Sequence, residues 1–322
     1  MIIVEIEENA GIGNQMFQYA HAYALAEKYD QKILIVSHLG RADNVREYML
    51  NRMCLDKKRV IGTIRVDWFN FLQFFPFITK KNALNRAFRF VLRAASKGLI
   101  KSGLFELRTM PKIQNRKFEK EQPFQKGKNY YIRGFFESYR YFDEYRAGIQ
   151  RQFSLQRVPC EAAECVNKIE NTNSVAVHIR RGDFTICGRL LPISYYDHAI
   201  QYLEKELKHP EFFILCEDEE VREHYRLWQK SNIHIIDIAI KNRDIVEWYL
   251  ISRCKHHVIT NSTYSWWSAY VSEREGKRVF IPDADLYLAC ENADIYVDEK
   301  YGMQHYTDYF LPEYEVLPKY SE

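Results

Sequence analysis

Short apolar runs alternate with amphipathic stretches along the second half of the chain. Five runs have the length and composition of buried strands, namely 175–179, 212–216, 233–238, 257–260 and 279–281. Apolar residues recur at helical spacing in the segments between them, at about 194–207, 219–230, 243–254 and 264–273. Strands that alternate with helices of this length form parallel β–α–β units. Ser194 and Asp197 also have the spacing of a capping box, which would begin the first of these helices.

The beginning of the chain has the pattern of a further β–α–β unit. Its elements are, in order, a strand at 2–6, a glycine turn at 10–13, a helix at about 14–29 and a strand at 32–36. A polar stretch at 159–174 separates this half of the chain from the other. We therefore predict an α/β protein of two Rossmann-like domains that face a cleft, with the boundaries 1–158 and 159–322. Ligands of such sheets bind beyond the carboxyl ends of the strands.

Charge and cysteine content argue against several classes of protein. The net charge of +3 is close to balance, so a nucleic-acid-binding protein is not expected. The seven cysteines are scattered and form no Cys-x-x-Cys, which predicts reduced thiols in a cytoplasmic protein and no zinc site. The N-terminus has no basic region followed by a long apolar run, and charges interrupt every apolar stretch. We expect neither a signal peptide nor a membrane span.

One strongly basic segment lies at residues 80–120, where twelve Lys and Arg residues oppose two Glu residues. Residues 87–95 within it have the pattern of a basic amphipathic helix. A solvated helix face is the simpler interpretation. The alternative is peripheral contact with the inner face of the membrane.

A predicted buried strand runs directly into a group of charged residues. The strand contains His178, and Arg180, Arg181, Gly182 and Asp183 follow. Guanidinium groups bind phosphate oxygens through paired hydrogen bonds and stay charged at neutral pH. The glycine permits close approach of the backbone to a ligand. The pattern favours a phosphate site over a structural salt-bridge cluster, and the aspartate would orient an arginine or bind a substrate hydroxyl.

A hydroxyl-rich turn follows another predicted strand and leads into a helix. Asn261, Ser262 and Thr263 form this turn, and Trp266 and Trp267 lie in the helix. Backbone N–H groups and the helix dipole make such a turn an anion site. Ordinary capping by the asparagine or the serine is compatible with that role. The two tryptophans are expected to belong mostly to the core.

Polar residues also follow two further predicted strands. Gly13, Asn14 and Gln15 begin the first helix, where the two amides would point into the cleft. Taken alone, the glycine pattern there is equally typical of a tight strand-to-helix turn. Glu217 and Asp218 directly follow the strand at 212–216 and are candidates for donor binding.

Together these segments resemble the family 11 glycosyltransferases, the inverting α-1,2-fucosyltransferases that use GDP-fucose. The opening motif of that family, Gly-Gly-Leu-Gly-Asn-Gln-Met-Phe-Gln-Tyr-Ala, is matched by Ala10–Ala20, although its first glycine is Ala10 here. His-x-Arg-Arg-Gly-Asp is matched by His178–Asp183, and Asn-Ser-x-Phe-Ser-Trp-Trp by Asn261–Trp267. Gly134–Phe142 is similar to the family's Gly-Tyr-Phe-Gln-Ser segment. The matches are of the bacterial type and occur in the expected order.

This resemblance implies a GT-B type fold, in which the C-terminal domain binds GDP-fucose and the N-terminal domain contributes to the acceptor site. It implies no metal ion and no cofactor besides the donor substrate. Arg180 would clamp the β-phosphate, supported by Arg181 and Asp183, and Ser262 and Thr263 would bind further phosphate oxygens. The expected acceptor is a galactose-terminated glycan, and a bacterial surface polysaccharide is a natural context.

The general base and the exact reaction stay open at the level of sequence. Asp183, Glu217, Asp218 and His178 are all candidates for the base, and a good leaving group such as pyrophosphate also allows a weak base. Fucose transfer with another linkage, such as α-1,6, is one alternative. A metal-dependent transferase of UDP-sugars is a second, since Asp283-Ala-Asp285 follows a strand, although a loop pair of carboxylates is favoured there. A non-catalytic sugar- or nucleotide-binding module is the third.

Overall fold

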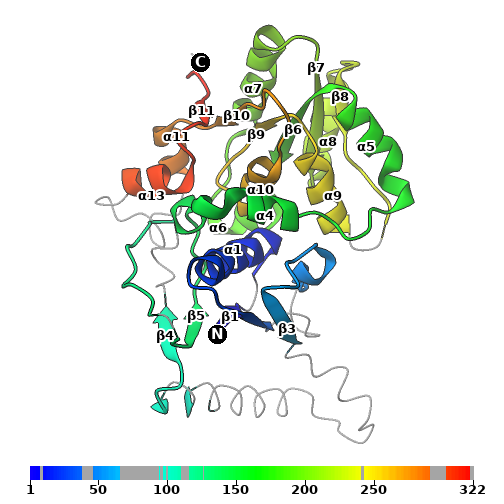
Figure 1. Cartoon of the computed structure of the whole chain (residues 1–322). Coiled ribbons are helices and arrows are strands. Elements are labelled where there is room, and N and C mark those ends of the chain that lie inside the picture. The colour runs from blue at the N-terminus through cyan, green and yellow to red at the C-terminus, as the bar shows by residue number, and fades with distance from the viewer. Residues whose placement is uncertain are drawn as a thin grey trace, which may run out of the picture. The chain divides into compact units, whose positions relative to one another are not determined.

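The structure, a computed structural model, describes residues 1–7, 10–37, 46–65, 94, 97–98, 101–109, 116–125, 127–240, 243–290 and 302–319. The chain divides into two compact units, which can be followed by colour in Figure 1. Unit 1 consists of Met1–Asn51 and Leu55–Arg146, and unit 2 of Arg52–Cys54 and Ala147–Glu322. The division predicted from the sequence, after residue 158, lies somewhat further along the chain. The acceptor and donor roles of the two domains stay predictions.

Six parallel strands form the sheet of unit 2. In chain order they are β6 (Asn173–Ile179), β7 (Pro210–Cys216), β8 (Ile233–Ile235), β9 (His256–Val258), β10 (Val279–Ile281) and β11 (Glu315–Val316). Their spatial order is β11-β10-β9-β6-β7-β8, and each neighbouring pair is parallel. The chain moves from β6 through β7 to β8 and then returns to the other side of β6 at β9. The strand order therefore reverses between β6 and β9, which is where ligands bind in open parallel sheets.

Helices precede, connect and follow these strands. They are α4 (Arg146–Gln152), α5 (Ala163–Glu170), α6 (Gly182–Cys187), α7 (Ile193–Glu206), α8 (Glu219–Leu227), α9 (Arg243–Ser252), α10 (Thr263–Val271), α11 (Ala284–Ala289) and α13 (Gly302–Tyr309), with a 3-10 helix at Cys160–Ala162. The strands β6 and β7 are buried along nearly their whole length. Parallel sheets are usually covered on both faces, and their strands are therefore continuous apolar runs. One core cluster joins β6, β7 and α7 through Val177, Ile214 and Leu203.

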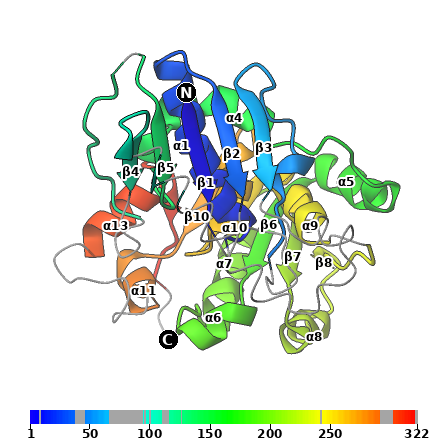
Figure 2. The ribbon, with the colours of Figure 1, turned by 90° about the horizontal axis from the view of Figure 1, so that it is seen from below.

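Unit 1 has a smaller parallel sheet. Its strands are β1 (Ile2–Ile6), β2 (Ile33–Ser37), β3 (Val60–Arg65), β4 (Glu106–Thr109) and β5 (Tyr130–Arg133), in the spatial order β3-β2-β1-β5-β4. Figure 2 shows β1, β2 and β3 side by side. The long helix α1 (Ile12–Lys28) follows β1, and 3-10 helices lie at Leu50–Arg52, Tyr139–Tyr141 and Asp143–Tyr145. The strand order of this sheet reverses between β1 and β5.

The predicted α/β class and its two Rossmann-like units are confirmed, and two such units in one chain are the components of the predicted GT-B type fold. The predicted capping box is wrong. Helix α7 begins at Ile193, directly after Pro192, which occupies the N-cap position without a side-chain cap. Ser194 is therefore the second residue of the helix and not its cap. Asp197 instead contacts His224 at 3.1 Å.

Three other expectations meet the structure only in part. The amphipathic pattern at 87–95 lies outside the described residues, apart from residue 94. Within the described ranges, no helix is long and apolar enough to cross a membrane. The six cysteines whose side chains are described form no disulfide.

Candidate active site

Arg180 lies at the carboxyl end of β6, beside the reversal of strand order in unit 2. Two carboxylates hold its guanidinium: NH2 contacts Asp183 Oδ1 at 2.5 Å, and NH1 contacts Glu217 Oε1 at 3.1 Å. The Arg180 side chain is 21% exposed. A guanidinium has five N–H donors, and these two contacts leave others for phosphate oxygens. The arginine is thus oriented before any ligand arrives.

Gly182 is required for this arrangement. Its backbone has a φ of +37°, which disfavours residues with a side chain. A Cβ atom at this position would lie 2.7 Å from Glu217 Oε1. The same oxygen accepts a hydrogen bond from the backbone N–H of Arg181 at 3.3 Å. The glycine therefore lets the carboxylate of the neighbouring strand end approach the Arg180 loop.

Arg181 lies on the other face of the sheet, as expected from the alternation of side chains along an extended segment. Burial raises the pKa of Cys216 to about 11, and the positive charge of Arg181 acts against this rise. The charge of Arg181 has the same effect on buried Tyr196, in helix α7. The guanidinium of Arg180 contacts both Asp183 and Glu217. Among the described contacts, the guanidinium of Arg181 contacts neither.

His178 lies two residues before Arg180, so the two side chains are on the same face of the strand. Its ring packs on Tyr264 of helix α10, with 4.8 Å between ring centroids. Burial, together with the nearby charge of Arg180, lowers the pKa of His178 to about 3. The ring is therefore neutral at pH 7 and a poor proton acceptor. His178 is therefore a poor candidate for the general base.

The turn after β9 leads into the N-terminus of helix α10. Ser262 is the N-cap residue and makes no side-chain cap hydrogen bond, so the predicted capping by this side chain is absent. The Asn261 amide donates to the carbonyl of Arg189 at 3.1 Å. Tyr264 donates to the carbonyl of Asp244 at 2.6 Å, which fastens the first turn to helix α9. The first N–H groups of a nine-residue helix thus lie at the strand reversal, where they favour an anion.

The prediction that Trp266 and Trp267 belong to the core is confirmed. Both side chains are fully buried. Trp266 Nε1 donates to the carbonyl of Tyr309 at 2.7 Å, and Trp267 packs edge-to-face on Phe153. These contacts fix helix α10 behind its N-terminus.

Asp218 and Glu217 have different surroundings despite their adjacency. Asp218 caps helix α8: its carboxylate accepts hydrogen bonds from the N–H groups of Glu220 and Val221 at 3.0 and 3.3 Å. Its side chain is thus occupied by the backbone of the helix, which speaks against the predicted part in donor binding. Glu217 turns toward Arg180 and remains 39% exposed.

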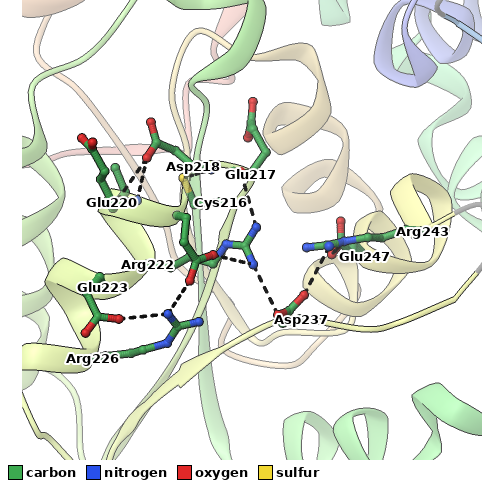
Figure 3. A network of polar contacts seen from close by, with 12 residues as sticks. Cys216, Glu217, Asp218, Glu220, Arg222, Glu223, Arg226, Asp237, Arg243 and Glu247 are labelled. Carbon is green, nitrogen blue, oxygen red and sulfur yellow. Dashed lines mark hydrogen bonds and ion pairs between the residues drawn. The ribbon is translucent and has the colours of Figure 1, made fainter.

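A network of ion pairs, drawn in Figure 3, continues along the same edge of the sheet. Arg222 joins the carbonyl of Glu217 at 3.4 Å to the carboxylate of Asp237 at 3.3 Å, and Asp237 contacts Arg243 at 3.2 Å. Arg243 pairs in turn with Glu247, whose pKa burial raises to about 7. The network braces the carboxyl ends of β7 and β8. This network was not predicted from the sequence, although charged residues near the ends of the strands could have indicated it.

The first helix places its predicted site residues in unit 1. Gln15 is fully buried, and its amide donates to the carbonyls of Ala10 and Glu47 at 2.9 and 2.8 Å. Its oxygen accepts from the N–H of Met49 at 2.9 Å. The expectation that this amide points into a cleft is therefore corrected: it ties the turn after β1 to residues 47–49. Gly13 is buried and Asn14 is half-buried in the same turn of helix.

Asp283 and Asp285 have separate contacts. Asp283 caps helix α11 by accepting from the N–H of Leu286 at 3.1 Å. Asp285 pairs with Lys319 at 2.7 Å on the surface. Asp283 is thus the N-cap of α11 and Asp285 lies in its first turn, in place of the loop pair of carboxylates that was favoured from the sequence. Among the described residues no group of three metal-ligating side chains was found.

The strand order and the chemistry at its reversal define a class of protein. When the six strands of unit 2 are numbered in chain order, their spatial order is 3-2-1-4-5-6, which is the strand order of the classic Rossmann fold. An oriented arginine and a helix N-terminus meet at the reversal, and both bind phosphate. Unit 2 thus has the strand order of the Rossmann class.

Comparison with known proteins gives the family. The model of glycosyl transferase family 11 matches residues 105–303, more than half of the chain. The chain belongs to this family and is a glycosyltransferase, as its motifs predicted. It is 29% identical to an α-1,2-colitosyltransferase of Escherichia coli, over 84% of the chain and 88% of the relative. It is 26% identical to the O-antigen biosynthesis glycosyltransferase WbnK of Escherichia coli, over 85% and 92% of the two chains. It is also 25% identical to the galactoside 2-alpha-L-fucosyltransferase SEC1 of Bos taurus, over 46% and 43%.

Proposed function

We propose that this glycosyltransferase transfers L-fucose from GDP-β-L-fucose to the 2-hydroxyl of a galactose-terminated glycan, with inversion and without a metal ion. Unit 2 would bind the donor and unit 1 the acceptor. The observation that carries the proposal is the placement of Arg180 near the N-terminus of helix α10, at the strand reversal of a sheet with the Rossmann strand order. The names of two relatives, an α-1,2-colitosyltransferase and a galactoside 2-alpha-L-fucosyltransferase, support the linkage.

The chemistry follows from the charge that develops on the leaving group. Inversion requires one displacement, in which the sugar acquires oxocarbenium character while the bond to the β-phosphate breaks. Negative charge then grows on the phosphate oxygens, and a cation aimed at them stabilises the transition state more than the ground state. Arg180 supplies this cation, and Ser262 and Thr263 would donate to further phosphate oxygens. Asp183 and Glu217 hold the guanidinium in place.

The candidates for a general base are reduced by their contacts. His178 is a weak base because of its burial, and Asp218 caps a helix. Asp183 and Glu217 both pair with Arg180, so their carboxylates are committed to the arginine. We propose that no residue of unit 2 acts as a strong base. The bond from the sugar C1 to the β-phosphate of GDP breaks as the acceptor oxygen bonds to C1, and a β-phosphate oxygen of the departing GDP takes the proton of the acceptor hydroxyl. Asp183 is then a positioning residue.

The donor is tested by direct competition. Purified full-length protein is incubated with GDP-fucose or with GDP-colitose, each with a panel of galactosides and EDTA, and released GDP is followed. Colitose lacks one hydroxyl that fucose has, and a site that binds this hydroxyl rejects the analogue strongly. Fucosylated product with an α-1,2 linkage in EDTA is the expected result. Transfer of colitose but not of fucose would contradict GDP-fucose as the donor. An α-1,6 product would contradict the proposed linkage. A requirement for added metal would favour the UDP-sugar alternative.

We further propose that this enzyme is cytoplasmic and that its basic segment 80–120 contacts the inner membrane peripherally. The excess of Lys and Arg there supports the proposal, because basic segments are attracted to anionic lipid surfaces. Sedimentation with anionic vesicles at low salt is expected. Equal recovery in the supernatant with anionic and neutral vesicles would refute it.

A further inference from the structure

The chain turns sharply where β5 ends, at the strand reversal of unit 1. Gly134, which directly follows β5, has a φ of +139°, and Phe136 has a φ of +53°. The N–H of Ser138 donates to the carbonyl of Phe136 at 2.7 Å, which closes the turn. Because β1 and β5 are neighbouring parallel strands, the segment 134–138 leaves the sheet at the edge where such sheets bind ligands.

The left-handed conformation of Phe136 is unusual for a bulky residue. In the part of the chain that the structure describes, the other non-glycine residues with a positive φ are Asp30, His209 and Gln229. These three residues are polar and exposed, and they lie near the ends of helices or strands, where single left-handed residues are common. Phe136 is only 2% exposed. A strained backbone of this kind costs free energy and persists where the surrounding structure enforces it.

Contacts from distant parts of unit 1 hold Phe136 in place. Its ring packs on that of His21 in helix α1, with 4.0 Å between ring centroids, and meets Tyr141 edge-to-face at 5.4 Å. The hydroxyl of Tyr141 accepts from the N–H of Glu119 at 2.9 Å. His21 is fully buried, and its Nε2 lies 3.0 Å from Oε2 of Glu121. The imidazole therefore cannot turn away from the phenylalanine without losing its carboxylate partner.

The next residues of the turn are fixed as well, and one side chain is left accessible. Glu137 accepts from Nε of Arg116 at 3.2 Å, and both side chains are buried. Ser138 caps the following 3-10 helix by accepting from the N–H of Arg140. Phe135 is the one residue of the segment that is not buried. The turn thus presents an aromatic side chain at the ligand edge, and aromatic side chains are frequent in the lining of small-molecule sites.

We infer that the segment 134–138 contacts the acceptor through Phe135, and that His21, fixed by Glu121, is a positioning residue that holds the segment in this conformation. The inference rests on the proposed function for the role of unit 1 as acceptor domain. Backbone strain is concentrated at functional sites, where it prepares the site before a ligand arrives. A turn with a structural role alone would not need a bulky residue at a φ of +53°, since glycine adopts this conformation without strain.

Hydrogen–deuterium exchange of the full-length protein, loaded with GDP, tests the segment without requiring turnover. Exchange of peptides that cover 134–138 is compared without sugar and with saturating methyl galactoside or other methyl hexosides. His21→Ala removes the ring that packs on the turn, whereas His21→Phe keeps a ring there and loses only the contact with Glu121. Phe135→Ala removes the proposed contact to the acceptor. The matched control is His234→Ala, which breaks the pair of His234 and Glu211 in unit 2.

The positioning role and the contact role predict different results. In His21→Ala, exchange of the segment without sugar should rise about tenfold, because the turn loses its support. The KM for the acceptor should rise about tenfold, with the KM for GDP-fucose within about twofold of the wild type, and His21→Phe should recover most of the loss. Phe135→Ala should raise the acceptor KM to a similar extent and leave the exchange without sugar unchanged. His234→Ala should change neither quantity.

A sugar that serves as acceptor should slow exchange of the segment in the wild type and not in Phe135→Ala. Exchange that no sugar slows would overturn the inference, as would an unchanged acceptor KM in Phe135→Ala. If His21→Ala does not fold, His21→Phe and Phe135→Ala decide the outcome. Failure of the proposed function gives a different pattern, in which no galactoside is fucosylated although one of the sugars still slows exchange at 134–138 in a Phe135-dependent way.

Discussion

The carboxyl edges of the two sheets resemble each other in topology and differ in chemistry. Both sheets are parallel, and in both the chain passes outward over three strands before it returns to the other side of the first. In unit 2 the reversal carries Arg180 and the N-terminus of helix α10. In unit 1 it carries the buried carboxylate of Glu5, with Arg133 as its partner. The two sheets share the order of their first three strands but differ beyond the reversal, where β5 lies beside β1 in unit 1 and β9 lies beside β6 in unit 2, and the charged residues at the two edges differ as well.

The two edges also differ in how their polar side chains are used. Around Arg180, the carboxylates of Asp183 and Glu217 remain 48% and 39% exposed, so their contacts can be exchanged for a ligand. In the first turn of unit 1, the amide of Gln15 is fully buried on backbone groups. Topology thus fixes where a ligand can bind, and exposure separates the groups that could meet it from those that hold the backbone.

The largest expected effect is at the anion edge. Replacing Arg180 with alanine should lower kcat by about a hundred- to a thousandfold, or about 3–4 kcal/mol of barrier, because the donor to the developing phosphate charge is lost. The matched control is Arg226→Ala, which removes an arginine that pairs with Glu219 and Glu223 on helix α8. Single-turnover assays with saturating donor measure both. Near-normal turnover of the Arg180 variant would remove this residue from the mechanism.

The next effect tests whether Gln15 is structural. Gln15→Leu leaves two carbonyls and one N–H without their partner in a buried place, and we expect a loss of about 2–3 kcal/mol in the free energy of unfolding. Urea denaturation followed by circular dichroism measures it. An unchanged free energy together with a raised acceptor KM would instead give Gln15 the ligand role that its motif first indicated.

Acid should weaken unit 2 through His178. The folded pKa of about 3 lies below the ordinary value of 6.5, so the unfolded chain takes up a proton that the folded chain refuses. Stability from this group is full above about pH 6.5 and falls as the pH drops toward 3, by about 1.4 kcal/mol per pH unit. Between pH 7 and pH 5, the free energy of unfolding should therefore fall by about 2 kcal/mol less in His178→Gln than in the wild type. Urea unfolding at both pH values, followed by tryptophan fluorescence, measures it, and equal losses in both proteins would contradict it.

The smallest effect concerns Asp218. If its role is the cap of helix α8, Asp218→Ala should cost about 1 kcal/mol of stability and leave the KM for GDP-fucose unchanged. Asp218→Asn should restore most of the loss, since asparagine also caps helices. Melting curves and donor titrations of the two variants give the answer. A raised donor KM in Asp218→Asn at unchanged stability would return this residue to the donor site.

Several residues show why the site could be found from the sequence only in part. Arg180 was predicted correctly to lie at a strand end because a buried apolar strand and its charged continuation are local features. The contact of Glu217 with Gly182, by contrast, joins two strand ends 35 residues apart and has no local pattern. The network of Arg222, Asp237 and Arg243 depends in the same way on the pairing of β7 with β8.

The sequence by itself determined the α/β class, the strands β6 to β10 and the helices α7 to α10 of unit 2, and the family, because these depend on periodicity and on short motifs. Only the tertiary structure decided which of two adjacent residues faces the ligand edge. Arg180 and Arg181, or Glu217 and Asp218, are equivalent in a motif. They differ once strand alternation and helix capping assign each side chain its neighbours, and those neighbours are distant in the chain. The same holds for Glu5 and Arg133, whose pairing across 128 positions exists only in the folded sheet.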